Sequence, residues 1–342
     1  MKLKEIGEFG LIARLKNKVY RPDQRVIAGI GDDAAAVQVS GDQLLLLTSD
    51  VLVERVHFDR RIQSFRQIGW RTMVANVSDI AAMGGLPRHA LVSICLPGTV
   101  SVEDTEEIYD GMQAVAAEHD FGIIGGDTVS SPRDLVISVC MTGEVSRKHL
   151  LTRKGAQAGD LICVTGELGG SQAGLAMLQV AGEQEERISP HLPDEEWSQV
   201  RERHLEPQAR LREARVLAQS GQVHAMIDVS DGLAGEVSHI AQESDVGAEI
   251  VQEKIPIGPQ TRRVAEHLGC SALDFALSGG EDFELVFTLS PKSARQIIKS
   301  VNDQTGTSVS IVGKVLPAKE GIVLVSSVGT QRPLRVKGYQ HF

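Results

Sequence analysis

Short, unbroken apolar runs alternate with longer stretches of helical periodicity along the first part of the chain. Four runs have the length of buried strands, and they cover Leu44–Thr48, His89–Leu96, Phe121–Ile124 and Leu135–Thr142. Between them, Phe65–Met83 and Val102–His119 repeat apolar residues with the spacing of a helix, and Gly84-Gly85 ends the first of these helices. Alternation of this kind predicts an α/β or α+β domain.

The pattern restarts after Arg147. Strands are predicted over Asp160–Thr165, Ala225–Asp228, Glu284–Leu289, Val309–Val315 and Ile322–Ser326, and helices over Ser171–Val180, Leu233–Glu243 and Pro291–Thr305. The charged, proline-containing stretch Glu183–Glu206 is typical of a surface excursion with helical pieces. We therefore expect two domains with a boundary near residue 148.

Composition narrows the class of protein. With 42% hydrophobic and 23% charged residues, the 342-residue chain has the make-up of a soluble globular protein. Its net charge of −10 gives no reason to expect a nucleic-acid or membrane partner. No apolar run approaches the roughly 18 residues of a membrane span, and the start lacks the apolar core of a signal peptide, so we expect a cytoplasmic protein. The four cysteines contain no CxxC pair and are expected to be buried free thiols.

Six short acidic motifs, set among glycines and apolar residues, carry most of the chemical information. They are Gly31-Asp32-Asp33, Thr48-Ser49-Asp50, Asn76-Val77-Ser78-Asp79, Gly125-Gly126-Asp127-Thr128, Asp228-Val229-Ser230-Asp231-Gly232 and Ser278-Gly279-Gly280-Glu281-Asp282. No Lys or Arg lies within four residues of any of these carboxylates, although a buried carboxylate is unfavourable unless its charge is compensated. Divalent cations are the natural compensator, and hard oxygen ligands suit Mg²⁺, which commonly shares its coordination with substrate phosphates.

Each motif alone also has an ordinary structural explanation. Gly126-Asp127-Thr128 is typical of a turn, and Asp79, which shares a helix face with Asn76, fits a solvent-facing residue as well as a buried ligand. The segment 228–232 follows a predicted strand and fits a helix N-cap as well as two carboxylates that share a cation, with Ser230 near a phosphate. Six such elements, mostly at strand ends or helix starts, favour one common cation site.

Several nucleotide-binding and catalytic signatures are absent from the sequence. It contains no G-x-x-x-x-G-K-[ST] phosphate-binding loop, no protein-kinase signature set and no His/Cys cluster with zinc spacing. It also has no obvious nucleophile–base pair, so cation-assisted phosphate chemistry fits the sequence better than covalent catalysis does.

Taken together, seven segments resemble the thiamine-monophosphate kinase family, a branch of the aminoimidazole-ribonucleotide-synthetase-like ATP-binding superfamily. The segments are Gly29–Ala35, Asp50–Phe58, Asn76–Gly84, Gly125–Thr128, Asp228–Leu233, Leu277–Leu285 and the tail Lys337–Phe342. The acidic motifs are shared across the superfamily, whereas the Val-Glu-x-x-His-Phe segment and the Gly-aromatic-x-His-Phe end are more specific to this family. The resemblance covers nearly the whole chain, from Glu8 to the last residue.

The resemblance implies a two-domain aminoimidazole-ribonucleotide-synthetase-like fold, α/β plus α+β. Residues 1–148 would form an N-terminal α/β domain for ATP and Mg²⁺ binding and for dimerisation, with its sheet pairing across a homodimer, and residues 149–342 a C-terminal α+β domain. It also implies ATP-dependent phosphorylation of thiamine monophosphate to thiamine diphosphate by direct in-line transfer, with several Mg²⁺ ions.

The family's functional residues carry over to matching positions of this sequence. Mg²⁺ would be bound by Asp33, Thr48, Ser49, Asp50, Asp79, Asp127, Asp228 and Asp231. ATP would be contacted by Tyr109, Gly126, Asp127, Arg153 and Ser230, and thiamine monophosphate by His57, Glu281 and Tyr339. Many relatives have Gly where Arg55 stands, so the turn before His57 is the main departure.

Two alternatives stay open at this point. One is another ATP-using synthetase of the same superfamily, but a selenium-handling enzyme would call for a reactive Cys before Cys95, and a hydrogenase-maturation relative for a Cys where Phe342 stands. The other is a non-catalytic protein that binds metal ions or nucleotides. An assay of ATP hydrolysis and diphosphate formation with thiamine monophosphate separates all three.

The chain's end provides a first test. Two aromatics and a His in the last four residues are unusual for a frayed terminus, so we expect the tail to fold back with Tyr339 stacking on a thiamine ring. Deleting residues 338–342 is expected to raise KM for thiamine monophosphate roughly fivefold and KM for ATP much less, because one stacking contact is worth on the order of 1 kcal/mol. An unchanged KM for thiamine monophosphate in steady-state kinetics would remove Tyr339 from the site.

Overall fold

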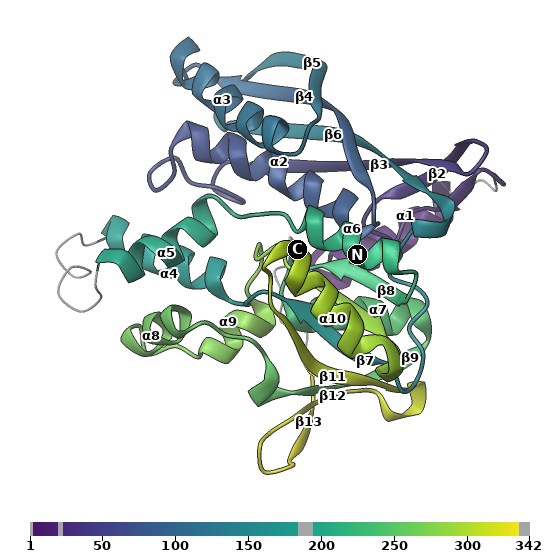
Figure 1. The fold of residues 1–342 in the computed structure, drawn as a ribbon. Coiled ribbons are helices and arrows are strands. Elements are labelled where there is room, and N and C mark those ends of the chain that lie inside the picture. Colours follow the sequence, from purple (N-terminus) through teal and green to yellow (C-terminus); the bar gives the residue numbers. More distant parts are fainter. Residues whose placement is uncertain (1–2, 20–22, 184–193, 335–342) are drawn as a thin grey trace.

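Two mixed β-sheets and their covering helices make up the protein in the computed structural model, which describes residues 3–19, 23–183 and 194–334 (Figure 1). The strands are β1 (Val26–Ala28), β2 (Ala35–Ser40), β3 (Gln43–Val53), β4 (Leu86–Pro97), β5 (Gly122–Ser131), β6 (Val136–Ser146), β7 (Leu161–Thr165), β8 (Val223–Asp228), β9 (Val246–Val251), β10 (Leu285–Leu289), β11 (Val309–Pro317), β12 (Ile322–Val325) and β13 (Gln331–Pro333). The helices are α1 (Leu3–Val19), α2 (Phe65–Ala82), α3 (Val102–Glu118), α4 (Gly170–Glu183), α5 (Asp194–Leu205), α6 (Leu211–Ser220), α7 (Leu233–Ser244), α8 (Pro259–His267), α9 (Ala272–Ser278) and α10 (Pro291–Thr305).

The first sheet has the strand order β1-β2-β3-β6-β4-β5. Strand β3 pairs antiparallel with β6 along its full length, and β4 runs parallel to β5, to which α3 connects it. Helices α2 and α3 pack together on one face of this sheet (Figure 1). The other face carries half-exposed apolar side chains, such as Val51 (47%) and Leu91 (46%), so no second layer covers it within the described residues.

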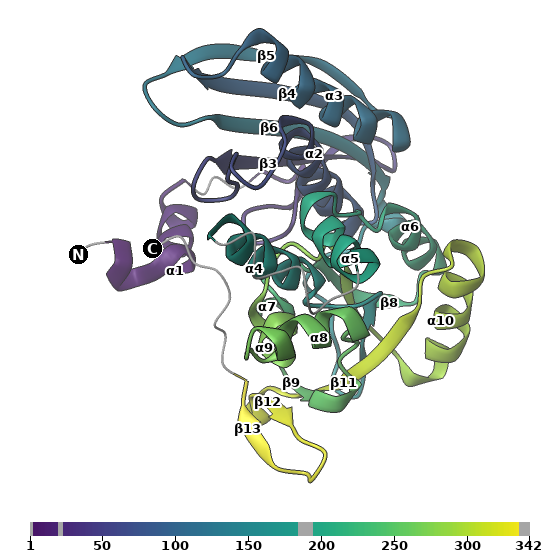
Figure 2. The same ribbon diagram turned by 90° about the vertical axis from the view of Figure 1, so that its left-hand side faces the viewer.

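The second sheet has the order β13-β12-β9-β11-β7-β10-β8 and is antiparallel except where β9 meets β12. Helices α6 and α10 lie on one face, and α7 and α9 lie on the other (Figure 2). Phe287 packs into the core on the α10 side, and its neighbour Val286 packs into the core on the α7 side. Because both faces are covered, β7 and β10 are almost entirely apolar.

Helix α2 connects the two domains. It packs on β3 and β6 of the first sheet and also against α6 and β8 of the second domain. Val77 and Ile80 of α2 accordingly share one apolar core with Leu217 and Met226. This contact brings the last turns of α2 next to the end of β8, where several of the acidic motifs meet.

All predicted strands and helices are present, but three strands of the first sheet are longer than predicted: β3 continues to Val53, β6 to Ser146 and β5 to Ser131. Strand β5 does not end at Ile124; it continues through the two glycines to Ser131, because it pairs with β4 across a shift in register. Gly126 makes this possible, since its φ is 156° and a Cβ there would lie 1.7 Å from the carbonyl oxygen of Val92. The hydrophobic pattern did not predict β1, β2, β9, β13, α6, α8 and α9.

The four cysteines are free, as predicted, but only Cys163 is buried; Cys95 and Cys140 are half-buried and Cys270 is exposed. Among the helices described here, none combines the length and the apolar character needed to cross a membrane.

Helices α2 and α3 cross at two reciprocal glycines. A Cβ on Gly69 would lie 1.9 Å from the carbonyl oxygen of Ile108, and a Cβ on Gly111 would lie 1.9 Å from that of Arg66. Gly69→Ala is therefore expected to lower the free energy of unfolding by about 1–3 kcal/mol, because the added methyl group forces the helices apart. Denaturant unfolding measures this.

Gly235→Ala in α7 is the matched control, since its Cβ would meet only the Cβ of Asp231, at 3.8 Å. It is expected to leave stability unchanged or to raise it by up to about 1 kcal/mol through helix propensity. Equal unfolding midpoints for the two variants would contradict this account of the helix crossing.

Candidate active site between the two domains

A cavity of about 1150 Å³ lies between the two domains. The first domain lines it with β3, the loop 54–63 and α2, and the second domain lines it with α4, α5 and the segments 228–231 and 278–283. One end of the cavity is acidic, and the other end contains His57, His204 and Glu281.

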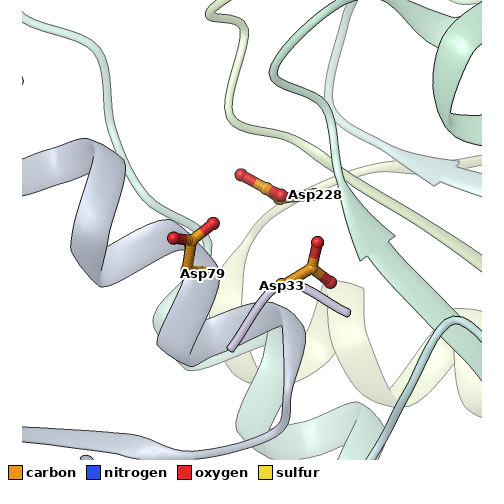
Figure 3. Close-up of side chains that lie close together, drawn as sticks. All are labelled: Asp33, Asp79 and Asp228. Atoms are coloured by element: carbon orange, nitrogen blue, oxygen red, sulfur yellow. The ribbon is translucent and has the colours of Figure 1, made fainter. Parts of the chain in front are cut away.

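Three carboxylates from both domains converge at the acidic end (Figure 3). Oxygens of Asp33, Asp79 and Asp228 all lie within 4.8 Å of one another. Asp33 precedes β2, Asp79 lies in the last turns of α2, and Asp228 ends β8. Asp50 of β3 and Asp231 line the same cavity together with Ser49 and Ser230.

Hydrogen bonds from neighbouring side chains hold these carboxylates in place. Thr48 Oγ1 donates to Asp79, and Ser78 Oγ donates to Asp228 at 2.6 Å. Arg153 donates from Nε to Asp33 Oδ1 at 3.0 Å and also from Nη2. Only Arg153 brings positive charge to the cluster in these contacts, so the cluster keeps a net negative charge whenever its carboxylates are ionised.

Burial raises the pKa values throughout the cluster, and repulsion between carboxylates raises those of Asp79 and Asp228 further. Burial raises the pKa of Asp50 to about 6. Burial and then repulsion from Asp33 raise the pKa of Asp228 to about 7. For Asp79, burial first and then three neighbouring carboxylates raise the pKa well above its usual value. A cation at this point would relieve both effects, because it favours the ionised carboxylates.

The loop after β8 is fixed by a buried glutamate. Glu236 Oε1 accepts the backbone N–H groups of Ser230 at 3.2 Å and of Asp231 at 2.9 Å. Gly232 completes the turn with φ 97°, and a Cβ there would lie 2.7 Å from the carbonyl oxygen of Leu277. The two hydrogen bonds set the position of Ser230 and Asp231 at the cavity wall.

The other end of the cavity is built on a turn that begins at Arg55. Arg55 has φ 67°, a left-handed conformation that favours glycine, and its N–H donates to the carbonyl oxygen of Phe58 at 2.7 Å. The Arg55 side chain pairs with Asp134. His57 Nδ1 accepts the N–H of Val53 at 3.0 Å, so the proton of a neutral His57 is on Nε2.

Most, but not all, of the predicted site residues come together in this chain. Residues at or next to the cavity are Asp33, Thr48, Ser49, Asp50, His57, Asp79, Arg153, Asp228, Ser230, Asp231 and Glu281. Tyr109, Gly126 and Asp127 do not line it. Tyr339 lies outside the described residues.

Asp127 and Asp50 lie on strands of the first sheet that are three strand spacings apart. Asp50 is opposite Val139 on β6, Val139 is opposite Val92 on β4, and Val92 is opposite Gly126 on β5. Three strand spacings correspond to roughly 14 Å, which is too far for the two carboxylates of one chain to share an ion. Strand β5, which carries Asp127, is exposed on both faces over residues 124–130.

Sequence reasoning missed several polar residues of the site. Asp32 and Asp282 belong to acidic motifs and could have been singled out; Asp32 accepts the N–H of Arg153 at 3.1 Å, and Asp282 accepts those of Gly169 at 2.6 Å and Ser171 at 3.0 Å. Glu236, Arg71 and His204 gave no signal, because only tertiary packing brings them to the site.

Comparison with known proteins identifies the family. The family AIR synthase related protein, N-terminal domain, matches residues 31–145, and its C-terminal domain counterpart matches residues 157–326. Thiamine-monophosphate kinase of Aquifex aeolicus is 38% identical over 84% of this chain and 87% of its own length. Thiamine-monophosphate kinase of Bacillus subtilis is 33% identical over 98% of this chain and 100% of its own length.

A solved structure described as AaThiL complexed with AMPPCP and TMP has the same fold. Its TM-score is 0.84 at 34% identity, and the match covers 100% of this chain and 99% of that one. The two-domain AIR-synthase-like fold predicted from the sequence is therefore confirmed. The chain belongs to the thiamine-monophosphate kinase family.

Proposed function

We propose that this protein transfers the terminal phosphoryl group of ATP to thiamine monophosphate, which yields thiamine diphosphate and ADP. The observation that carries the proposal is the convergence of carboxylates from both domains at one end of a cavity of about 1150 Å³. Relatives named thiamine-monophosphate kinase, and AaThiL complexed with AMPPCP and TMP, support the same reaction.

The acidic end fits divalent cations by its chemistry. Its donors are carboxylate and hydroxyl oxygens, which suit Mg²⁺. Asp33 Oδ2 is buried without a hydrogen-bond partner among the described residues, which leaves a lone pair for an ion. We propose that several Mg²⁺ ions are held by Asp33, Thr48, Ser49, Asp50, Asp79, Asp127, Asp228 and Asp231. Mg²⁺ held by these residues would offset the negative charge that develops on the phosphates during transfer.

The reaction needs no general base from the protein. The acceptor is a phosphate monoester with a second pKa near 6, so it is already largely a dianion at pH 7. The protein's task is to align the two phosphate groups for direct in-line transfer. We propose that Tyr109, Gly126, Asp127, Arg153 and Ser230 position ATP, and that His57, Glu281 and Tyr339 position thiamine monophosphate.

A serine–histidine contact in the cavity lining does not change this conclusion. Ser171 Oγ lies 3.1 Å from Nδ1 of His204. Ser171 is only 1% exposed, and burial, followed by the charge of Arg71, lowers the pKa of His204 to about 3. Such a histidine is a weak base and the serine is shielded, so a phosphoserine intermediate is not expected.

We propose further that the working unit is a homodimer with shared active sites. The uncovered face of the first sheet exposes Ile124 (63%) and Val129 (46%) beside Val51 and Leu91, and a second copy would bury them. Asp127, too far from Asp50 in its own chain, would then serve the partner's site. The domain division at residue 148 and a cytoplasmic location also remain proposals.

Removing single carboxylates tests the cation proposal. Asp50→Asn, Asp127→Asn and Asp231→Asn are each expected to abolish thiamine diphosphate formation while the fold stays intact, because each would lose an ion that positions phosphate. Product formation is measured at saturating Mg²⁺, with thermal unfolding as the check on folding. Wild-type activity in all three variants would refute the cation site, and a wild-type protein that forms no thiamine diphosphate would refute the proposed function.

Mixing two inactive variants tests the shared site. If Asp50 of one subunit works with Asp127 of the other, an Asp50→Asn/Asp127→Asn heterodimer has one intact site and one doubly altered site. Heterodimers purified through two different tags are then expected to show roughly half of the wild-type activity. If each chain contains its own complete site, both sites are damaged and the heterodimer is as inactive as its parents.

A further inference from the structure

Arg71, in the middle of α2, is a buried charged residue that the proposed mechanism does not use. Its side chain is 1% exposed, although an unpaired buried guanidinium is strongly unfavourable. Arg71 Nη2 donates to both carboxylate oxygens of Glu281 and, at 3.2 Å, to the carbonyl oxygen of His57. Arg71 thus ties together two residues that are proposed to bind thiamine and that come from different domains.

Stability alone does not explain this arrangement. Arg71 Nε and Nη1 are buried without a hydrogen-bond partner in the part of the chain that the structure describes. A buried ion pair with unsatisfied donors contributes little, and well-packed apolar residues often replace such a pair without loss of stability. Nη2 is the guanidinium nitrogen that makes hydrogen bonds, and its partners are Glu281 and His57, which both line the cavity. This points to a role of Arg71 in the cavity.

Glu281 is held in an unusual conformation and a defined charge state. Its φ is 65°, which is strained for a non-glycine residue, and its N–H donates to the carbonyl oxygen of Ser230 at 2.9 Å. Burial would raise the pKa of Glu281, but the charge and hydrogen bonds of Arg71, together with the nearby His204 and His57, outweigh it and hold that pKa below its usual range. The side chain is a third exposed and lines the cavity, so an ionised, oriented carboxylate faces the substrate.

The surroundings of Glu281 add little other charge. His204 of α5 lies 3.9 Å from Glu281 and is neutral near pH 7, since its pKa is lowered to about 3. His57 faces Glu281 from the loop 54–63, and Asp282 and Glu284 adjoin it in sequence. Arg71 is therefore the dominant positive charge acting on this carboxylate.

We propose that Arg71 is a positioning residue: it orients Glu281 and the turn at His57 around the thiamine part of the substrate. The inference rests on the proposed function. Thiamine has a permanently cationic thiazolium ring and an amino group that donates hydrogen bonds, and a fixed carboxylate complements both. We expect binding of ATP, at the acidic end of the cavity, not to depend on this side-chain pair, because Glu281 contacts Ser230 only through a backbone hydrogen bond, which a change of side chain leaves in place.

Substitution of Arg71 separates the two substrates. In Arg71→Met, KM for thiamine monophosphate is expected to rise about tenfold or more, because the charged Glu281 carboxylate that hydrogen-bonds thiamine is no longer oriented by Arg71. KM for ATP is expected to change less than twofold. Arg71→Lys should give an intermediate value, since Lys keeps the charge but not the fork. Arg66→Met, an exposed arginine on the same helix, is the matched control and should behave as wild type.

The pH profile distinguishes positioning from general damage. Without Arg71, burial raises the pKa of Glu281, so Glu281 gains a proton as the pH falls. The ratio of KM for thiamine monophosphate in Arg71→Met to that in Arg66→Met should therefore increase from pH 8 to pH 6. This ratio cancels the titration of the substrate's own phosphate. A ratio that does not change with pH would contradict the proposal.

A double substitution completes the test. If Arg71 acts through Glu281, adding Arg71→Met to Glu281→Gln should change KM for thiamine monophosphate less than twofold. The double variant should stay folded, because it removes both charges of the buried pair. A full additional loss, or equal losses for both substrates, would overturn the proposal. Calorimetric binding of thiamine monophosphate gives the same comparison without turnover, so an enzyme that binds the substrate but forms no product would refute only the proposed function.

Discussion

Repulsion among Asp33, Asp79 and Asp228 is the constraint on which the rest of this structure depends. Their carboxylate oxygens lie within 4.8 Å of one another, and two of these residues come from the first domain and one from the second. Packing the two domains together therefore takes like charges out of water: burial raises the pKa of all three carboxylates, and repulsion raises those of Asp79 and Asp228 further. The shared apolar core around α2 supplies the opposing attraction and keeps the carboxylates together.

Buried negative charge is compensated differently at the two ends of the cavity. At the acidic end, Arg153 neutralises part of the charge, and the Mg²⁺ ions proposed to bind with ATP would neutralise the rest. At the other end, Arg71 neutralises Glu281 permanently. The first arrangement favours an anionic triphosphate with its metal ions, and the second leaves one oriented carboxylate for a cationic, hydrogen-bonding ring.

There is a physical reason why the fold and much of the site could be predicted from the sequence. Buried strands and long helices leave a strong hydrophobic period, and carboxylates without neighbouring bases are conspicuous at their ends. The sequence could not show the tertiary contacts between residues that lie far apart along the chain. Arg71 sits on a face of α2 that the period marks only as buried, and its partner Glu281 is 210 positions away. The distance of Asp127 from Asp50 follows from strand order, which the alternation of elements does not determine.

Calorimetric unfolding of the wild type and of Asp79→Asn at pH 8, without and with Mg²⁺ and AMPPCP, tests the central claim most directly. If repulsion between carboxylates is what the cations relieve, Asp79→Asn should be more stable than the wild type without metal, because it removes one charge from the cluster. With Mg²⁺ and AMPPCP the order should reverse, because the wild type gains binding energy that the variant lacks. An Asp79→Asn protein that is less stable than the wild type under both conditions would contradict the claim.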